Sequence, residues 1–554
     1  MKARTRRLVL DAVLLGIIGA LSAKVFIFLL GLAQEIFLHR LAGYIPPGLP
    51  NEGGILKESL SSRSPWMIPL ATTLGGLLSG IIVYTWAPEA EGHGTDAMVR
   101  AFHRLGGYIR TRVPFLKMLA SAITIGSGGA AGREGPTALV SAGIGSLYAR
   151  VAKRPAEDRR LLMLMGSAAG LSAIFRSPIG TALFTIEVLY SEMEFEAGAL
   201  IFTLLAAVIA YTAMGLMGIC GPLFQVPPDL FVDVRQYYWY AILGVLSGPI
   251  GTILPVVFYG LRDLFLRIPI KPHFKPAIGA LGVGIMAIWL PQILGGGYGW
   301  IQMAMDGGLG WKLMLVLLFA KMIAFPLTVS SGGSGGVFAP SLFVGGMLGG
   351  AMAGLAHLPP ASFVVVGMAS VFGAAARVPI AAMFMVVEMT GAYLLLVPAA
   401  LAVLLSYLVQ SLLAADLKYP SLYEFQVPNR AESAAHQEEF LQTALDLLLK
   451  RRVSIPETIG HLNLLVLLEL GIPLELPDGK RLVIQTISAK SPWVDRPLKD
   501  IPLPEEAELI ALVREDHLLF PQGSLTLKAE DKLLFVTSIA GWKELNRIFG
   551  GSRV

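Results

Sequence analysis

Long apolar runs constrain the fold of this chain more than any other feature. A membrane-spanning helix needs roughly 20 apolar residues, and several runs approach or exceed that length. They are residues 8–38, 66–87, 199–219, 237–266, 275–294, 311–329 and 393–415. Only 15% of the residues are charged, against about 25% in a soluble domain. The sequence therefore predicts a polytopic membrane protein whose membrane part is all-α.

Charge frequency changes near Pro428. Charged residues are about twice as frequent after residue 430 as before it, which matches the composition of a soluble domain. Beyond residue 480, alternating apolar and polar residues are typical of β-strands. We therefore predict a membrane domain at 1–429, a helical linker at 430–480 and a small α/β cytosolic domain at 481–554.

The N-terminus places basic residues directly before the first apolar run, at Lys2, Arg4, Arg6 and Arg7. Basic flanks favour the cytoplasmic side of a membrane. We therefore expect an integral protein of the cell's inner (plasma) membrane with a cytoplasmic N-terminus. The charged C-terminal domain should lie on the same side, which requires an even number of full crossings.

Shorter apolar pieces, interrupted by glycine and proline, lie between the long runs. They are residues 115–132, 136–151, 160–175, 178–191, 340–356, 361–375 and 379–391. Such interruptions are tolerated at membrane depth only where the freed backbone is buried in protein or lines a watery cavity. When they recur in matching positions of two halves, they are the best sequence indication of a transport site.

The chain contains such a repetition. Residues 166–187 align without gaps to residues 367–388. Identities in this alignment are Gly166/Gly367, Ala168/Ala369, Arg176/Arg377, Pro178/Pro379, Ile179/Ile380 and Glu187/Glu388. Upstream pairs are Lys117/Lys321, Gly132/Gly336 and Pro136/Pro340. We infer two homologous halves, at about 8–219 and 237–427, and the residues leave open whether they are parallel or inverted, although inverted repeats are common in transporters.

Two glycine-rich breaks occupy equivalent places in the halves, GSGGAAGREGP (126–136) and SSGGSGGVFAP (330–340). Each ends in a proline, which suits the first turn of a helix. Helix N-termini present unpaired N–H donors and partial positive charge, so two that meet form an anion site. Close helix packing through small residues is the alternative. A phosphate-binding loop is disfavoured, because neither break contains GxxxxGK[ST].

Glu134 lies within the first break. An ionisable residue at membrane depth is functional by default, and a carboxylate beside an anion-attracting helix end can occupy the anion position itself. We expect it to gate the pore and to be linked to proton movement; the alternative is a structural helix cap. The adjacent Arg133 either pairs with Glu134 or anchors at the membrane interface, and the latter is the favoured reading.

These motifs resemble those of the CLC family of chloride channels and chloride/proton antiporters. GREGP (132–136) is similar to the gating-glutamate motif, GGVFAP (335–340) to the GxFxP motif, and SLYEF (421–425) to the tail motif. The resemblance implies an inverted-repeat fold with broken helices and a homodimer with one pore per subunit. The anion-binding residues it implies, with the departures below, are Gly132, Arg133, Gly135, Gly336, Val337, Phe338, Tyr423, His93 and Gly94. Without the motifs, Tyr423 would read as an interfacial tyrosine.

The sequence departs from the family pattern in two places. GHGTD (92–96) stands where the family typically has GSGIP, so His93 replaces a chloride-selecting serine; a surface-loop histidine is the alternative. Val188 occupies the inner position where exchangers often carry a glutamate. This favours an anion channel, with chloride/proton exchange as the alternative.

The remaining repeated charged residues are expected to be structural: Arg176, Glu187, Arg377 and Glu388. Cys220 is the only cysteine, which excludes a disulfide framework, and no metal-ligand pattern or basic-aromatic pattern appears. No metal, cofactor or nucleic acid is therefore expected. A membrane-embedded enzyme is disfavoured because no nucleophile-base pair is visible in the sequence. A potassium-uptake protein is disfavoured because it would need TVGYG-type selectivity-filter repeats, which are absent.

The C-terminal residues resemble the TrkA-C module of potassium-transport regulators, through "SPWVDRPLKDIPLPEEAELIALVRED" and "GSLTLKAEDKLLFV". In that family the modules pair as dimers and can bind small ligands, including nucleotides. The resemblance implies either a regulatory sensor with a nucleotide-type ligand or a dimerisation module without one. The expected partners are membrane lipids, chloride ions and a second copy of the chain.

Overall fold

The computed structural model describes the chain in two compact units, Met1–Pro428 and Asn429–Val554. Each unit is described by itself. The described residues are 2–549 apart from 61–64, 228–232, 434, 437–473, 476–479, 488–490, 505, 515–516, 520, 522 and 524.

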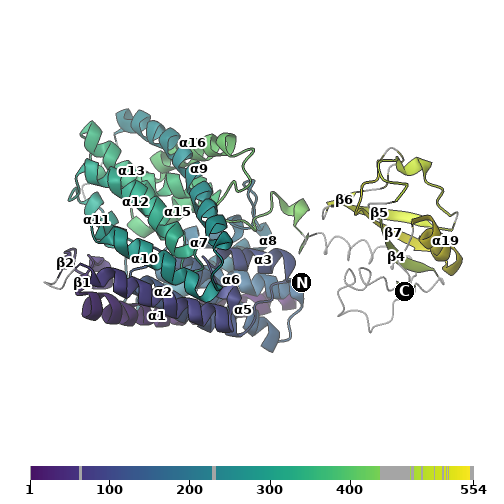
Figure 1. Ribbon diagram of the computed structural model, residues 1–554, viewed down its shortest axis with the longest axis horizontal. Helices are drawn as coiled ribbons and strands as arrows, with labels where there is room; N and C mark the ends of the chain where they lie inside the picture. Colours follow the sequence, from purple (N-terminus) through teal and green to yellow (C-terminus); the bar gives the residue numbers. More distant parts are fainter. Residues whose placement is uncertain are drawn as a thin grey trace. The chain divides into compact units, whose positions relative to one another are not determined.

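The first unit is built almost entirely of helices (Figure 1). Helices of the first half are α1 (Lys2–Gln34), α2 (Met67–Trp86), α3 (Thr95–Arg104), α4 (Arg112–Gly126), α5 (Glu134–Val151), α6 (Ala156–Phe175), α7 (Pro178–Glu187) and α8 (Ala197–Leu216). Helices of the second half are α9 (Tyr237–Arg267), α10 (Lys275–Ala287), α11 (Tyr298–Met305), α12 (Trp311–Val329), α13 (Phe338–Ala356), α14 (Pro360–Ala376), α15 (Pro379–Thr390) and α16 (Leu396–Leu413).

Short elements connect these helices. A π-helical stretch, Glu35–Ala42, follows α1, and a two-stranded antiparallel hairpin pairs β1 (Tyr44–Ile45) with β2 (Ser59–Leu60). The 3-10 turns of this unit are Pro50–Glu52, Pro88–Ala90, Val234–Gln236, Pro272–Phe274, Pro291–Ile293 and Tyr393–Leu395.

Among the described residues, 7 helical segments are long and apolar enough to cross a membrane. Two predicted runs differ from the structure. The run 275–294 was predicted to span, but α10 ends at Ala287 and a 3-10 turn begins at Pro291, because the residue before a proline is disfavoured in the α conformation. The short piece predicted at 340–356 instead belongs to α13, whose 19 residues are long enough to span.

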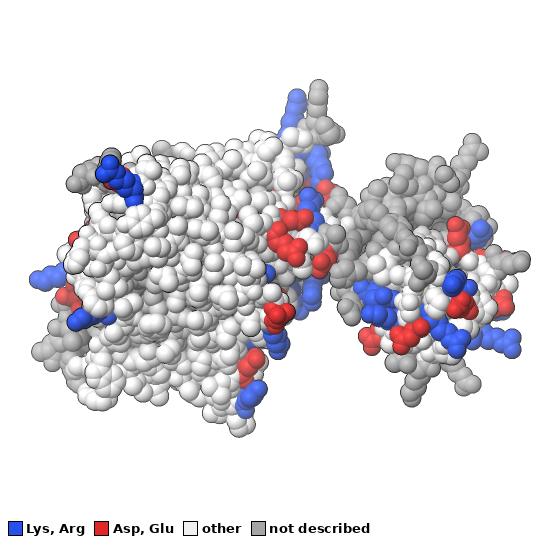
Figure 2. All heavy atoms as spheres, turned by 90° about the horizontal axis from the view of Figure 1, so that it is seen from above, with Lys and Arg blue, Asp and Glu red and all other residues white. Residues whose placement is uncertain are grey.

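Most of the long helices face outward, whereas the broken helices and α13 are largely buried. Residues 361–376 of α14 and 162–175 of α6 are buried throughout, whereas the long helices expose large apolar side chains such as Phe28, Ile201 and Phe319. In the view of Figure 2, charged side chains gather at opposite edges of this unit and leave a broad uncharged middle. An exposed apolar surface of this kind is suited to lipid, and it encloses the interrupted segments that need burial.

The two halves are inverted. The equivalent residues Gly132 and Gly336 form an isolated antiparallel bridge. Each N–H donates to the other residue's carbonyl, at 2.8 Å from Gly132 and 2.7 Å from Gly336. Such a reciprocal antiparallel contact between equivalent residues places a local two-fold axis between the two breaks, as an inverted repeat requires. The predicted inverted-repeat, broken-helix fold is confirmed.

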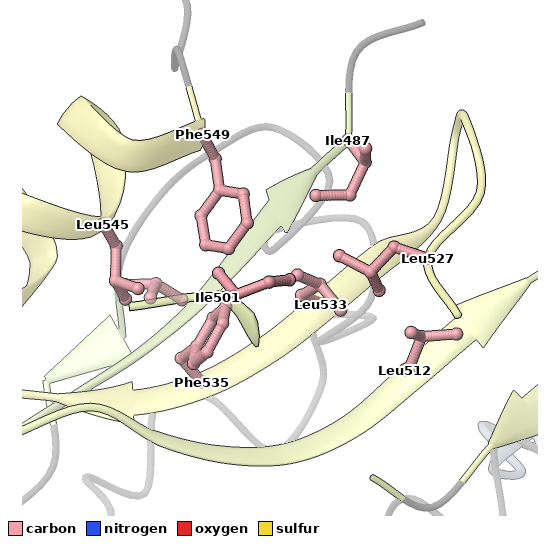
Figure 3. Packing of buried hydrophobic residues seen from close by; sticks show 9 residues of the cluster. Ile487, Ile501, Leu512, Leu527, Leu533, Phe535, Leu545 and Phe549 are labelled. Carbon is pink, nitrogen blue, oxygen red and sulfur yellow. The ribbon is translucent and has the colours of Figure 1, made fainter. Parts of the chain in front are cut away.

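The second unit contains an antiparallel sheet in the order β3-β4-β7-β5-β6. Its strands are β3 (Leu474–Glu475), β4 (Arg481–Thr486), β5 (Glu508–Arg514), β6 (His517–Leu519) and β7 (Lys532–Thr537), and α19 spans Ile539–Phe549. Figure 3 shows Leu533 and Phe535 of β7 packed with Leu545 and Phe549 of α19. The predicted small α/β domain is confirmed.

The predicted helical linker at 430–480 lies mostly outside the described residues. Its described parts are the 3-10 turn Arg430–Glu432, the neighbouring residues 433 and 435–436, the strand β3 and Lys480. A further 3-10 turn, Leu498–Asp500, lies within the sheet domain.

Candidate functional site: a carboxylate between two helix ends

The glycine-rich breaks bring two helix N-termini together. Helix α5 begins at Glu134 and helix α13 begins at Phe338. Oε1 of Glu134 accepts a hydrogen bond from the backbone N–H of Phe338 at 2.5 Å. Helix N-termini favour negative charge because their first N–H groups have no partner within the helix. The carboxylate of the first half therefore occupies an anion position at the helix end of the second half.

Glu134 is enclosed and only partly satisfied. The residue is 3% exposed, and Oε2 has no hydrogen-bond partner in the described part of the chain. A Cβ atom added to Gly132 would overlap Oε2, and one added to Gly336 would overlap Oε1. Both glycines are therefore needed to leave room for the carboxylate.

Two buried lysines hold matching loops in the two halves. Nζ of Lys117 donates to the carbonyls of Ala90 at 2.9 Å and Gly92 at 2.6 Å. Nζ of Lys321 donates to the carbonyls of Ile293 at 2.7 Å and Gly295 at 2.6 Å. The repeat thus equates loop 92–94 with loop 295–297. A Cβ added to Gly135 would overlap the backbone carbonyl of His93, so the first loop also packs directly against α5.

Each loop lines a cavity. A cavity of about 820 Å³ is lined by loop 92–94 together with Asp96, Phe258 and Glu424, and we call it the His93 cavity. A smaller cavity of about 160 Å³ is lined by loop 295–297 together with Arg133. Because the two loops are equivalent in the repeat, the cavities are lined by matching parts of the two halves. Arg133, next to Glu134 in the sequence, lines the smaller cavity, and Gly94, on which a Cβ would meet Gly135, lines the larger one.

Arg133 borders the smaller cavity and is 5% exposed. Its guanidinium donates to Glu52 at 2.7 Å and lies 4.8 Å from the ring centre of Tyr298. Arg133 is therefore buried and paired with Glu52, not with Glu134. Its positive charge is partly balanced at the mouth of the smaller cavity.

Tyr423 and His93 lie side by side, with ring centres 5.4 Å apart. Tyr423 is 2% exposed, and its hydroxyl has no hydrogen-bond partner among the residues that the structure describes. The ring of Tyr423 also packs on Phe184, and Phe372 links Phe184 to Phe338. These contacts connect the tyrosine to the helix end that binds Glu134.

This geometry agrees with the comparisons to known proteins. A family model described as "Voltage gated chloride channel" matches residues 75–411. The chain belongs to the CLC family. A TrkA-C domain model matches residues 482–550, so the second resemblance is confirmed as well.

Curated relatives of this CLC chain are similar over most of their length. A "Voltage-gated ClC-type chloride channel ClcB" of Salmonella typhimurium (strain LT2) is 29% identical over 75% of this chain and 98% of its own. The protein of the same name from Escherichia coli O81 (strain ED1a) is also 29% identical over the same shares.

Solved structures share the fold. A slow cyanobacterial Cl⁻/H⁺ antiporter superposes with a TM-score of 0.64 at 22% identity, over 75% of this chain and 96% of its own. A CLC-type fluoride/proton antiporter gives a TM-score of 0.65 at 21% identity, over 77% and 99%. A eukaryotic CLC transporter gives 0.60 at 23% identity, over 77% and 74%.

Val188 follows the end of α7 and is fully buried. The preceding residue, Glu187, caps α15 of the CLC fold by accepting from the N–H groups of Ile380 and Ala381. The equivalent Glu388 caps α7 by accepting from the N–H of Gly180 at 2.9 Å. The repeated glutamates are reciprocal helix caps, as a structural role requires.

Sequence reasoning did not find the partners of two site residues. Nε2 of His93 lies 3.0 Å from Oδ2 of Asp96, and Glu52 pairs with Arg133. The first partner had a local signal, because Asp96 lies only three residues after His93, across the start of α3. Glu52 had none, since it lies far from Arg133 in the sequence.

Proposed function

We propose that this CLC protein exchanges chloride for protons across the inner membrane. The observation that carries the proposal is the seat of Glu134, whose carboxylate binds a helix-end N–H that an anion would otherwise use. One group then competes directly with the transported anion and also titrates. Such a group couples the two movements, because the seat holds either a carboxylate or an anion.

The exchange follows from charge. While ionised, Glu134 is held by the N–H of Phe338 and blocks the route between the cavities. When a proton binds, the carboxylate loses its charge and its strong charge-assisted hydrogen bond. The neutral side chain leaves the seat, chloride enters it, and the proton is released when the carboxylate returns.

Val188 in the sequence favoured a channel, and the ClcB relatives are named as channels. The neighbours in fold include two named as proton antiporters. Exchange is the better proposal because the buried carboxylate occupies the anion seat itself, and this arrangement does not depend on the residue at position 188. A channel is the alternative outcome of the test below.

The test is proton movement in sealed proteoliposomes with a chloride gradient and a pH probe inside. Wild-type protein should drive protons uphill while chloride runs downhill. Glu134→Gln should abolish proton movement and leave chloride flux in place, because the amide cannot release a proton. Glu157→Gln is the matched control, since Glu157 is exposed and pairs with Arg4. Chloride flux without proton movement in the wild type would establish a channel instead.

We further propose that the protein works as a homodimer in lipid with both termini cytoplasmic, and that the TrkA-C domain regulates transport by binding a nucleotide-type ligand. The support is the family and the second domain's resemblance to ligand-binding modules. Mass measurement in lipid nanodiscs tests the first point, and flux with added nucleotide tests the last.

A further inference from the structure

Three properties together distinguish His93 from the other described residues that line the His93 cavity. It lines the His93 cavity, its ring packs against Tyr423, and it is only 5% exposed. Its Nε2 lies 3.0 Å from Oδ2 of Asp96. Its other ring nitrogen, Nδ1, is buried without a hydrogen-bond partner among the described residues, as is the hydroxyl of Tyr423. Buried polar atoms are rarely left unpaired, so two on adjacent rings are candidates to bind a water or an ion.

The pair with Asp96 fixes which proton the imidazole carries. A carboxylate only accepts, so the N–H of a neutral His93 lies on Nε2 and points to Asp96. Nδ1 then has a lone pair and repels an anion. A protonated imidazole is a donor at both nitrogens, so protonation turns Nδ1 into an N–H donor. The same step changes the net charge of the His93–Asp96 pair from −1 to 0 by formal charges.

We propose that His93 is a proton-dependent chloride ligand, so that chloride binding next to Tyr423 takes up a proton on Nδ1. The proton comes from water of the His93 cavity and returns to it when chloride leaves. The inference rests on the proposed function in taking chloride as the transported anion. Only the first half has this proton-dependent ligand, because the residue of the second half that is equivalent to His93 is Gly296.

Other ionisable groups lie near His93, and their protonation can also contribute to a pH dependence of chloride binding. Lys117 of α4 donates to the carbonyl of the adjacent Gly92, and Arg262 of α9 pairs with Glu424. Glu134 is the strongest confounding group, because its protonation also admits chloride. The ionisable residues that line the cavity include Tyr84, Glu89, Glu91, Asp96, Arg100, Tyr108, Arg110, Tyr259, Arg262, Lys275 and Glu424.

The experiment therefore uses Glu134→Gln, in which the gate residue cannot titrate. Chloride binding to the full chain in detergent is measured by calorimetry at about pH 5.5 and about pH 8, the range in which histidines change charge. At each pH two buffers of different ionisation enthalpy report the protons taken up. We expect tighter binding at the lower pH, by up to about tenfold per pH unit, and uptake approaching one proton.

Three variants in the Glu134→Gln background assign the proton. Adding His93→Ser should give a dissociation constant that is equal at both pH values, with no proton uptake. Adding Asp96→Asn should weaken the linkage while the imidazole remains, because the charged acceptor that fixes the tautomer is gone. Adding His103→Gln removes another buried histidine, one that bonds the carbonyl of Leu189, and should keep the linkage.

The proposal is overturned if Glu134→Gln binds chloride equally at both pH values or does not bind it. It is also overturned if the pH dependence survives His93→Ser or disappears with His103→Gln. This binding assay is separate from the flux assay of the proposed exchange. If chloride binding takes up a proton but the wild type drives no protons uphill, only the proposed exchange is refuted. If the wild type drives protons uphill but chloride binding does not depend on pH, only the role of His93 is refuted.

Discussion

At the scale of single residues, glycines around Glu134 differ in what a side chain would displace. The three nearest atoms to a Cβ on Gly132 all belong to the carboxylate of Glu134, which is the end of a flexible side chain. A Cβ on Gly135 would meet the backbone carbonyl of His93, in a loop that Lys117 holds. The first clash is relieved when the Glu134 side chain moves, and the second only when the backbone of loop 92–94 moves.

We expect Gly132→Ala to fold and to open the gate. The new methyl group should push the carboxylate out of its seat, so chloride flux should rise several-fold and the protons moved per chloride should fall. Gly135→Ala should instead lose about 1–3 kcal/mol of stability through overpacking. Flux in proteoliposomes and melting temperature in detergent distinguish the two. Wild-type coupling in Gly132→Ala would contradict the assignment of the seat.

At the scale of helices, the repeat is held together by exchanged caps. Glu388 on α15 accepts from Ser177 Oγ at 2.7 Å and from the N–H of Gly180 at the start of α7. Glu187, the last residue of α7, caps α15 in return. Capping satisfies N–H groups that the helix itself leaves unpaired, so each half completes a helix of the other.

Glu388→Ala should therefore destabilise the membrane unit without changing the anion seat. Buried donors left without a partner cost about 1–3 kcal/mol, so the melting temperature should fall by several degrees. Glu187→Ala should have a similar effect, and Glu388→Gln a smaller one because one oxygen acceptor remains. Proton coupling per chloride measured below the melting transition should equal that of wild type. A change in coupling would show that Glu187 and Glu388 also take part in transport.

At the scale of the whole molecule, the chain folds as two units with separate cores. The core of the second unit is a cluster on β4, β5, β7, α19 and their connections, which includes the fully buried Leu533 and Phe535 (Figure 3). Leu533→Ala should lower the stability of that unit by about 2–5 kcal/mol. Calorimetry of the purified protein should then show one transition shifted down and the other in place. A shift of both would mean that the two units unfold together.

The sequence by itself determined the membrane class, the duplicated halves and the chemistry of the breaks. Apolar length and glycine and proline positions act locally, through helix formation and backbone freedom, so they can be read without tertiary contacts. The position of Glu134 in its motif also indicated a gate. The end of α10 was misjudged because hydrophobicity continues to residue 294 while Pro291 already breaks the helix.

Only the tertiary structure decided the direction of the halves and the partners of the site residues. The Gly132–Gly336 bridge, the Glu52–Arg133 pair and the exchanged glutamate caps join residues that are far apart in sequence. Their formation depends on how whole helices pack, and no local propensity encodes it. The contact of His93 with Tyr423 is of the same kind, because the two residues lie far apart in the sequence and meet only in the folded chain.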